Sequence, residues 1–114
     1  MNPLRVHRSK SYKAWYNSLA PKTQGIVDTR IDIFISLGLL LKSKLLDPKL
    51  ELYEFKWDSG LRVYYAMIED SEGKLMLLLL GGNKNSQPRD ITVAKKIIRN
   101  ALSKIEEKII RSKK

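Results

Sequence analysis

Two cationic side chains are predicted to face each other across a β-hairpin. Lys56 and Arg62 stand in two runs of alternating apolar and polar residues, and the turn Asp58–Gly60 between them has glycine where a three-residue loop needs a left-handed residue. In the register set by that loop, Lys56 pairs with Arg62, and Glu54 pairs with Tyr64 on the same face. Like charges that are directly opposed destabilise a sheet. The pairing therefore indicates an anion bound between the cations or, alternatively, a solvated face on which Glu54 compensates the charge.

A third cation, Lys84, follows an apolar run that ends in two glycines. Leu75–Leu80 has the length and composition of a strand covered on both faces, so it is expected to be a central strand. Gly81 and Gly82 permit a positive φ and a close approach of the backbone to another group. Lys84 is thus predicted to lie just beyond the end of a buried strand.

A helix is predicted to begin shortly after Lys84 in the sequence, near residue 87. Pro88 suits the first helical position, which leaves Ser86 or Gln87 as the N-cap and Asp90 near the third position. The free N–H groups and the dipole of a helix N-terminus favour an anion. The polar side chains beside this helix start are those of Lys84, Asn85, Ser86, Gln87 and Arg89. They indicate a phosphate site, although ordinary turn chemistry with helix capping would use the same residue types.

Other catalytic schemes find little support in the residue types. The chain has one histidine, His7, no cysteine, and no cluster of ligands at metal-binding spacing. A histidine acid–base pair, a bound metal and a cofactor are therefore not expected. Glu54, Asp58 and Asp90 are assigned to pairing and capping instead.

The net charge of +10 is concentrated at the two ends of the chain. Residues 1–22 carry +5, residues 23–94 carry −1 and residues 95–114 carry +6. This asymmetry favours a polyanion such as RNA or DNA, or an acidic protein, as the partner. A solubilising surface with a frayed basic tail is the alternative.

The length of 114 residues suits one domain, 1–114, in which residues from about 106 form a basic helical tail. With 43% hydrophobic residues, the chain can build a core without disulfides or metal. The first residues lack the apolar region of a secretory signal, and no apolar run is long enough to span a membrane. A cytoplasmic protein is expected.

The first half of the chain is predicted to hold a short strand, residues 4–7, and two helices. Ser9 is the expected N-cap of the first helix, which Pro21 ends. The second helix is expected to run from about Thr23 to a C-cap at Gly38. The residues expected to line its core face are Ile26, Arg30, Ile33, Phe34 and Leu37.

Three antiparallel strands and a last helix complete the predicted elements. Strands are expected at residues 50–57, 61–69 and 74–80, whereas residues 39–50 are left unassigned. The last helix can pack on the sheet through Ile91, Ala94, Ile98, Ala101, Leu102 and Ile105. The predicted fold class is α+β, with the element order β-α-α-β-β-β-α.

A set of residues spread over about positions 5–105 carries a family resemblance. It consists of Tyr12, Trp15, Ile26, Arg30, Tyr53–Lys56, Gly60–Tyr65, Leu79–Gln87, Asp90, Ile91 and Ala94. In this order, and on the predicted elements, these residues resemble the RelE/ParE superfamily of bacterial toxin–antitoxin modules, most closely its addiction-module killer, or HigB-like, branch. Two segments, Leu39–Lys44 and Ser59–Leu61, depart from the pattern of similar proteins.

The resemblance implies a RelE-like fold and the toxin of a type II toxin–antitoxin module, acting as a ribosome-dependent mRNA endonuclease. RNA supplies its own nucleophile, the 2′-hydroxyl, so a metal-independent interferase needs cations that hold the phosphate and manage protons. The expected catalytic residues are Lys56, Arg62 and Lys84, and the expected RNA-binding residues are Tyr64, Asn85, Gln87 and Arg89. Because lysine is a weak base at its ordinary pKa, cleavage should depend on the ribosome to orient the mRNA.

Two other functions are compatible with the same resemblance. One is ParE-like inhibition of DNA gyrase, which requires no catalytic cations, and the other is a catalytically inactive nucleic-acid-binding relic. The implied partners of the nuclease are mRNA on the ribosome and a cognate antitoxin, often a helix-turn-helix protein, so that DNA is reached only through the antitoxin complex. The apolar segment Leu39–Leu46 is a candidate antitoxin contact.

Overall fold

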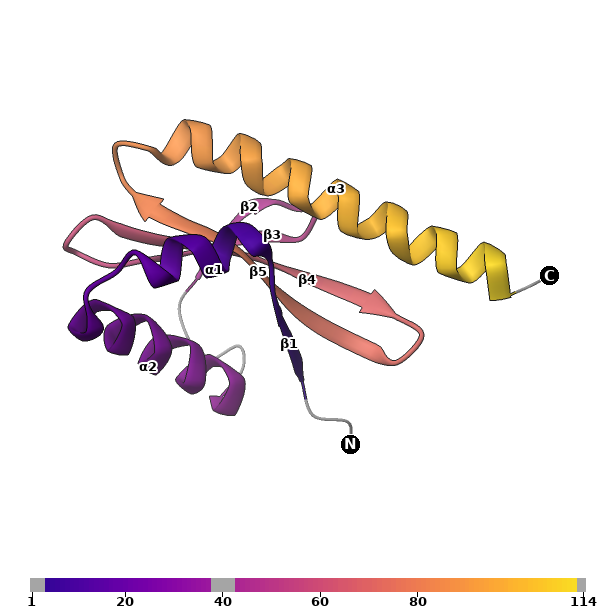
Figure 1. The fold of residues 1–114 in the computed structure, drawn as a ribbon, viewed down its shortest axis with the longest axis horizontal. Helices are drawn as coiled ribbons and strands as arrows, with labels where there is room; N and C mark the ends of the chain where they lie inside the picture. The colour runs from indigo at the N-terminus through magenta and orange to yellow at the C-terminus, as the bar shows by residue number, and fades with distance from the viewer. Residues whose placement is uncertain (1–3, 38–42, 113–114) are drawn as a thin grey trace.

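Five strands form one mixed sheet between two layers of helices (Figure 1). The computed structural model describes residues 4–37 and 43–112, with side chains described as far as Lys108. The strands are β1 (Arg5–Arg8), β2 (Lys44–Asp47), β3 (Leu52–Lys56), β4 (Leu61–Asp70) and β5 (Gly73–Asn83), and the helices are α1 (Lys10–Asn17), α2 (Pro21–Leu37) and α3 (Gln87–Ser112). The sheet order is β1-β5-β4-β3-β2, in which β1 is parallel to β5 and the other described pairings are antiparallel. The predicted α+β class is confirmed.

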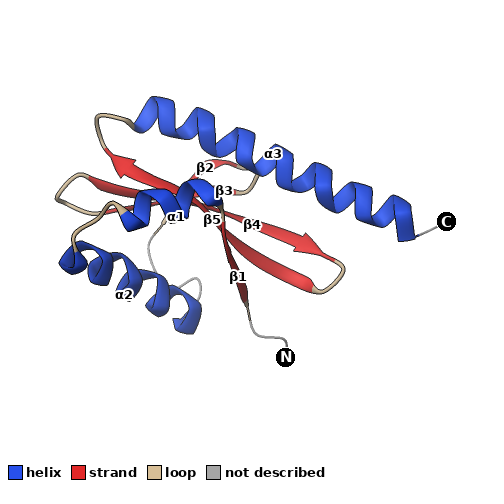
Figure 2. Cartoon of the chain, in the orientation of Figure 1, coloured by secondary structure: helices blue, strands red, loops and turns tan. Residues whose placement is uncertain are grey.

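The helices cover opposite faces of the sheet (Figure 2). The core beneath α1 and α2 contains Tyr12, Val27, Ile31, Phe34, Phe55, Val63, Tyr65, Met76 and Leu78. The core beneath α3 contains Leu52, Tyr64, Ala66, Ile68, Leu77, Leu79, Leu80, Ala94 and Ile98. Because side chains alternate along a strand, Glu54, Lys56 and Arg62 share the face that α3 covers.

The predicted hairpin turn at Asp58–Gly60 is present, and a second turn joins β4 to β5. Each uses a glycine with a positive φ: Gly60 at +100° and Gly73 at +107°. The strand that was predicted to end at Leu80 continues to Asn83, because both glycines that follow Leu80 pair with β4. β2 lies within the segment 39–50, for which the sequence predicted no structure. It is a short edge strand.

Ser9 caps α1 as predicted, since its Oγ accepts a hydrogen bond from the backbone N–H of Tyr12. α2 begins at Pro21, two residues before the predicted start. Proline suits this position because a helix leaves its first N–H groups unpaired. The C-cap predicted at Gly38 lies outside the described residues.

The core face predicted for α2 is correct at Phe34 and wrong at the other residues. The buried residues are Val27, Ile31 and Phe34, whereas Ile26 and Ile33 are 44% and 39% exposed. α2 carries apolar residues on two sides, so its periodicity could not identify the side that faces the sheet. One apolar side of α2 is therefore left toward solvent.

α3 begins at Gln87, as predicted, and continues to Ser112, so the tail predicted from about residue 106 is part of this helix as far as it is described. Ala94 and Ile98 are buried against the sheet, whereas Leu102, which was expected to face the sheet, is 40% exposed. In the part of the chain that is described, no helix is both long enough and apolar enough to cross a membrane.

Arg5 joins β1 to the turn between β4 and β5. Its guanidinium bonds to the carboxylate of Asp70 and to the carbonyl oxygen of Gly73, and lies 3.3 Å from the carboxylate of Glu72. The hydrogen bond from Arg5 is the main reason that the pKa of Asp70 is lowered from its ordinary value. The contact therefore stabilises the fold while Asp70 is ionised.

Replacing Arg5 with alanine should lower the melting temperature at pH 7 and have a smaller effect at pH 2. A carboxyl group whose pKa is depressed in the folded state contributes stability above its unfolded pKa of about 4, and this contribution is lost as the pH falls through the folded pKa. Thermal unfolding followed by circular dichroism at both pH values measures the difference. Arg8→Ala, on the same strand, is the control, and an equal loss at both pH values would contradict the prediction.

Candidate nucleic-acid interface

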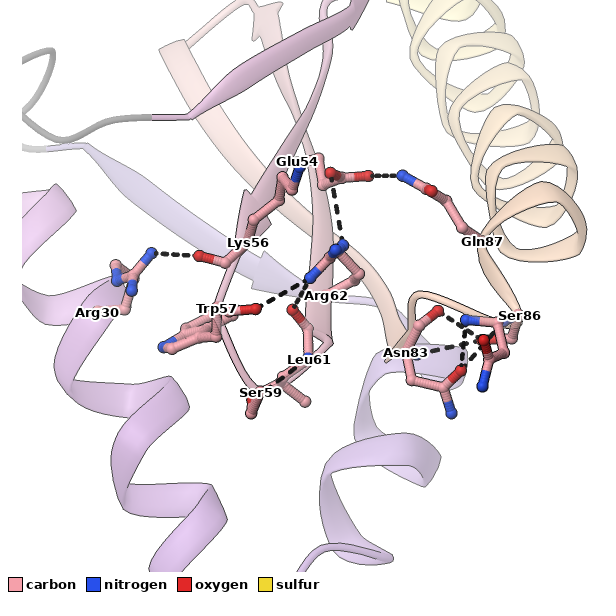
Figure 3. A network of polar contacts seen from close by, with 11 residues as sticks. Arg30, Glu54, Lys56, Trp57, Ser59, Leu61, Arg62, Asn83, Ser86 and Gln87 are labelled. Atoms are coloured by element: carbon pink, nitrogen blue, oxygen red, sulfur yellow. Dashed lines mark hydrogen bonds and ion pairs between the residues drawn. The ribbon is translucent and has the colours of Figure 1, made fainter.

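The hairpin register predicted from the sequence is confirmed, and it places Lys56 opposite Arg62. Arg62 is only 9% exposed. Its Nη1 donates hydrogen bonds to the carbonyl oxygens of Trp57 and Leu61, at 3.1 and 2.9 Å (Figure 3). Its Nε lies 3.8 Å from Oε1 of Glu54. The protein itself therefore holds the side chain of Arg62. Glu54 compensates the charge, as the alternative expected, but Arg62 and Glu54 are buried and do not lie on a solvated face.

Glu54 connects this hairpin to α3. It is 1% exposed, and its Oε2 accepts a hydrogen bond from Nε2 of Gln87, the first residue of α3. Its Oε1 and the Nε of Arg62 are both buried, and neither forms a hydrogen bond in the described part of the chain. The two charged groups are 3.8 Å apart, and opposite charges at this separation attract strongly when water is excluded. Gln87 was expected to contact RNA, but in this structure its amide orients Glu54.

Tyr64 lies beneath α3 and is fully buried. Its hydroxyl has no hydrogen-bond partner among the described residues. Burial raises the pKa of this hydroxyl, and the carboxylates of Glu54 and Asp90 raise it further, so the group stays protonated at neutral pH. A base cannot stack on a ring that α3 covers, so the RNA-binding role expected for Tyr64 does not fit its position.

The exposed cations of the predicted site are Lys56, Lys84 and Arg89. The backbone N–H of Lys84 donates to the carbonyl oxygen of Gly60 at 2.9 Å, and its methylene groups pass 3.7 Å from the point where a Cβ on Gly60 would lie. Lys84 is thereby fixed against the β3–β4 hairpin. Figure 3 shows the side chain of Lys56 running along β3 toward Glu54. Within residues 4–37 and 43–108, none of these three cations forms an ion pair.

The turn between β5 and α3 is held by its own side chains. Oδ1 of Asn83 accepts hydrogen bonds from the backbone N–H groups of Asn85 and Ser86, at 2.8 and 3.1 Å. The carbonyl oxygen of Ser86 accepts the first helical hydrogen bond, from Asp90, and its hydroxyl bonds to the Asp90 carboxylate. Ser86 is therefore the N-cap of α3, one of the two residues predicted. Asn85 is exposed beside Lys84.

Gly81 and Gly82 allow a close approach of the helices and do not adopt the positive φ that the sequence also permitted. A Cβ on Gly81 would lie 2.3 Å from the ring of Trp15, and a Cβ on Gly82 would lie 2.1 Å from Oδ2 of Asp90. α1 and α3 thus contact adjacent residues of β5 from opposite faces. The two glycines position both helices, and Gly82 makes room for the capped start of α3.

A contact between Arg30 and Trp57 was not expected from the sequence. The Cζ atom of Arg30 lies 4.3 Å from the ring centroid of Trp57, and its Nη1 donates to the carbonyl oxygen of Lys56 at 3.2 Å. Arg30 was expected on the core face of α2. An arginine within an apolar stripe was the available signal, but its partner on the hairpin could be found only from the tertiary structure.

The assembled side chains offer cations, amides and hydroxyl groups. In the described residues, no three His, Asp or Glu side chains are grouped so that they could hold a metal ion. Exposed cations beside a fixed turn can bind an anion and stabilise negative charge that develops on it. The arrangement therefore suits contacts to a phosphate backbone.

Comparison with known proteins finds likeness in structure alone. No protein-family model matches the sequence, and no curated protein matches it. A double mutant of the E. coli toxin RelE, solved in the free state, matches with a TM-score of 0.67 at 15% identity, over 85% of this chain and 99% of that chain. A chain of the toxin–antitoxin complex RelBE2 from Mycobacterium tuberculosis matches with a TM-score of 0.55 at 17% identity, over 72% of this chain and 99% of that chain. The structure therefore has the fold of the RelE toxins.

Proposed function

We propose that this protein is the toxin of a type II toxin–antitoxin module, in the HigB-like branch of the RelE/ParE superfamily, and that it cuts mRNA on the ribosome in the cytoplasm. The observation that supports this most directly is a set of three exposed cations on a RelE-like fold: Lys56 opposite Arg62 on the hairpin, Lys84 fixed against that hairpin, and Arg89 in the first turn of α3. Exposed cations of this kind bind the phosphate backbone of RNA. Asn85 and Arg89 are the proposed contacts to the flanking RNA.

The proposed reaction uses the 2′-hydroxyl of the RNA as the nucleophile. Its oxygen attacks the neighbouring phosphorus and loses its proton, and the bond to the 5′-oxygen breaks as that oxygen takes up a proton. Lys56 and Lys84 stabilise the negative charge that develops on the phosphate. Arg62, which is only 9% exposed and whose Nη1 and Nε face the protein, adds its charge from behind these two lysines. Lysine is a weak base at neutral pH, so the ribosome has to hold the mRNA in a reactive geometry.

The proposed protein partner is a cognate antitoxin of the helix-turn-helix type, and the protein reaches DNA only through that complex. The matched RelBE2 structure is a toxin–antitoxin complex, which supports the expectation of an antitoxin partner. Leu45 is 47% exposed and belongs to the apolar segment predicted as an antitoxin contact. The residues of that segment before Ser43 lie outside the described part of the chain.

The variant Lys56→Ala/Lys84→Ala should lose toxicity in bacteria. Both side chains are exposed, so the fold is expected to persist, while the loss of charge stabilisation at the phosphate should reduce cleavage about 100-fold or more. The measurement is the mapping of mRNA 5′ ends by primer extension after brief expression. New ends inside translated codons are expected for the parent chain and not for the variant.

Lys96→Ala/Lys104→Ala is the matched control, because it removes the same charge from exposed positions of α3. It should cleave like the parent chain. Growth arrest with intact mRNA and damaged DNA would favour gyrase inhibition instead, and no arrest at all would indicate an inactive binding protein. Full toxicity of the Lys56→Ala/Lys84→Ala variant would contradict the proposed nuclease.

A further inference from the structure

A second recognition feature lies on the other side of the hairpin from Arg62, where α2 meets the tip of β3. The guanidinium of Arg30 stacks 4.3 Å above the Trp57 ring and is held in place by its bond to the Lys56 carbonyl oxygen (Figure 3). Trp57 in turn packs edge-on against the buried ring of Phe55, with 6.3 Å between ring centroids. Arg30 and Trp57 therefore form a preorganised flat surface that the cation–π attraction stabilises.

An open cavity of about 680 Å³ lies against this surface. Its wall includes Thr23 and Ile26 of α2, the hairpin residues Asp58, Ser59 and Gly60, and Asn83 at the end of β5. A volume of this size is in the range of small-ligand sites. The cavity therefore combines a stacking surface and an aliphatic wall with polar groups at its rim.

The rim groups suit the edge of a nucleobase. Among the described residues, Ser59 Oγ accepts a single long hydrogen bond, 3.4 Å from the N–H of Leu61, and donates none, so its proton can be donated to a ligand. Oδ1 of Asn83 is used by the turn, which directs the amide NH₂ group toward other acceptors. Asp58 supplies an acceptor and repels a phosphate from the cavity. A base edge presents both donors and acceptors, which these groups can pair.

The cavity adjoins the proposed phosphate site at Gly60. Gly60 lines the cavity, and the methylene groups of Lys84 pass over Gly60 at 3.7 Å, so Lys84 stands at the border between the two. We propose that the cavity beside Arg30 and Trp57 binds a base of single-stranded RNA that flanks the phosphate held at Lys84. This inference rests on the proposed function, because it takes RNA as the substrate. Arginine planes and aromatic rings are the surfaces on which unpaired bases stack.

The test is the binding of a 2′-O-methylated hexaribonucleotide, which has no free 2′-hydroxyl and cannot be cleaved. The full chain with Trp15→Phe carries Trp57 as its one tryptophan, and stacking of a base should quench its fluorescence. In this background, Arg30→Ala should weaken binding about 10-fold, as expected for the loss of a stacking contact. In the otherwise parental chain, Trp57→Leu should weaken it to a similar degree, measured by anisotropy of a labelled RNA. Ile33→Ala, an exposed residue of the same helix, should change the affinity less than 2-fold.

Three results would overturn the inference: RNA that binds without quenching, an abasic ribose-phosphate hexamer that binds as tightly as the RNA, or polyglutamate that quenches as strongly. The last result would assign the cavity to an acidic protein segment, for which the exposed Ile26 provides an apolar contact. Thermal unfolding of each variant checks its fold. The RNA affinity of Arg30→Lys, which keeps the charge without the planar surface, separates the effect of stacking from the effect of charge. If a base quenches the fluorescence but the protein cuts no mRNA, the proposed nuclease activity is wrong and the proposed base-binding site is still supported.

Discussion

Replacing Glu54 with alanine is expected to lower the free energy of unfolding by about 3–5 kcal/mol. Glu54 is 1% exposed and is the carboxylate that faces the buried guanidinium of Arg62 across 3.8 Å. Removing it leaves a cation that is shielded from water and has no counter-charge, a cost that far exceeds the net worth of the intact pair. The same substitution also removes the acceptor of the Gln87 amide and so loosens the first turn of α3.

Urea unfolding followed by circular dichroism measures this loss. Glu69→Ala, an exposed glutamate of the same sheet, is the control and should stay within about 0.5 kcal/mol of the parent chain. The double variant Glu54→Leu/Arg62→Met should recover most of the loss, since apolar side chains of similar volume replace a buried ion pair at little cost. A loss below about 1 kcal/mol for Glu54→Ala would mean that water reaches Arg62 in solution and that the buried pair does not describe the protein.

The buried pair also bears on how the cations of the proposed site divide their roles. Arg62 is placed by Glu54 and by the hairpin carbonyl oxygens, whereas Lys56 and Lys84 reach solvent. An arginine held in this way keeps a fixed orientation, and the flexible lysines supply charge that follows the substrate. The hairpin therefore combines one preorganised cation with two adaptable ones.

The sequence predicted the hairpin well because two local signals agreed. The alternation of side chains along β3 and β4 and the glycine in the turn fix the register between them, so the opposition of Lys56 and Arg62 followed without tertiary information. The cap of α1 and the start of α3 were predicted for the same reason, since capping depends on residues close in sequence. The hairpin register and the helix starts depend on residues close in sequence, so sequence patterns were enough to predict them.

Burial of the site residues was not predictable in the same way. The exposure of Tyr64 depends on where α3 crosses the sheet, and that crossing is set by contacts such as Gln87 to Glu54 that join residues 33 positions apart. The face of α2 was misjudged because Ile26 and Val27 are both apolar and only the packed structure shows which one is inside. The sequence thus identified the cations of the candidate site but could not show which of them reach solvent.

Replacing Gly81 with alanine is expected to lower the free energy of unfolding by about 1–3 kcal/mol, the usual cost of overpacking a well-filled contact. The added Cβ would lie 2.3 Å from the indole ring of Trp15, and a rigid ring can make room only by moving as a whole. That movement would disturb the packing of α1, because Trp15 also contacts the buried ring of Tyr12 at 5.6 Å between centroids.

Gly25→Ala is the matched control, because the same change should have the opposite sign there. Gly25 lies in α2 with nothing within 4 Å of an added Cβ, so alanine should raise the stability by about 0.5–1 kcal/mol through its higher helix propensity. Urea unfolding of both variants measures the change in the free energy of unfolding, and the two values can be compared if the m-values are equal. A neutral Gly81→Ala would leave the glycine without a physical reason, since its φ is not positive and any residue could adopt its backbone. A loss at Gly81 and a gain at Gly25 would establish that the double glycine of β5 is required by the close contact with α1 and not by its conformational freedom.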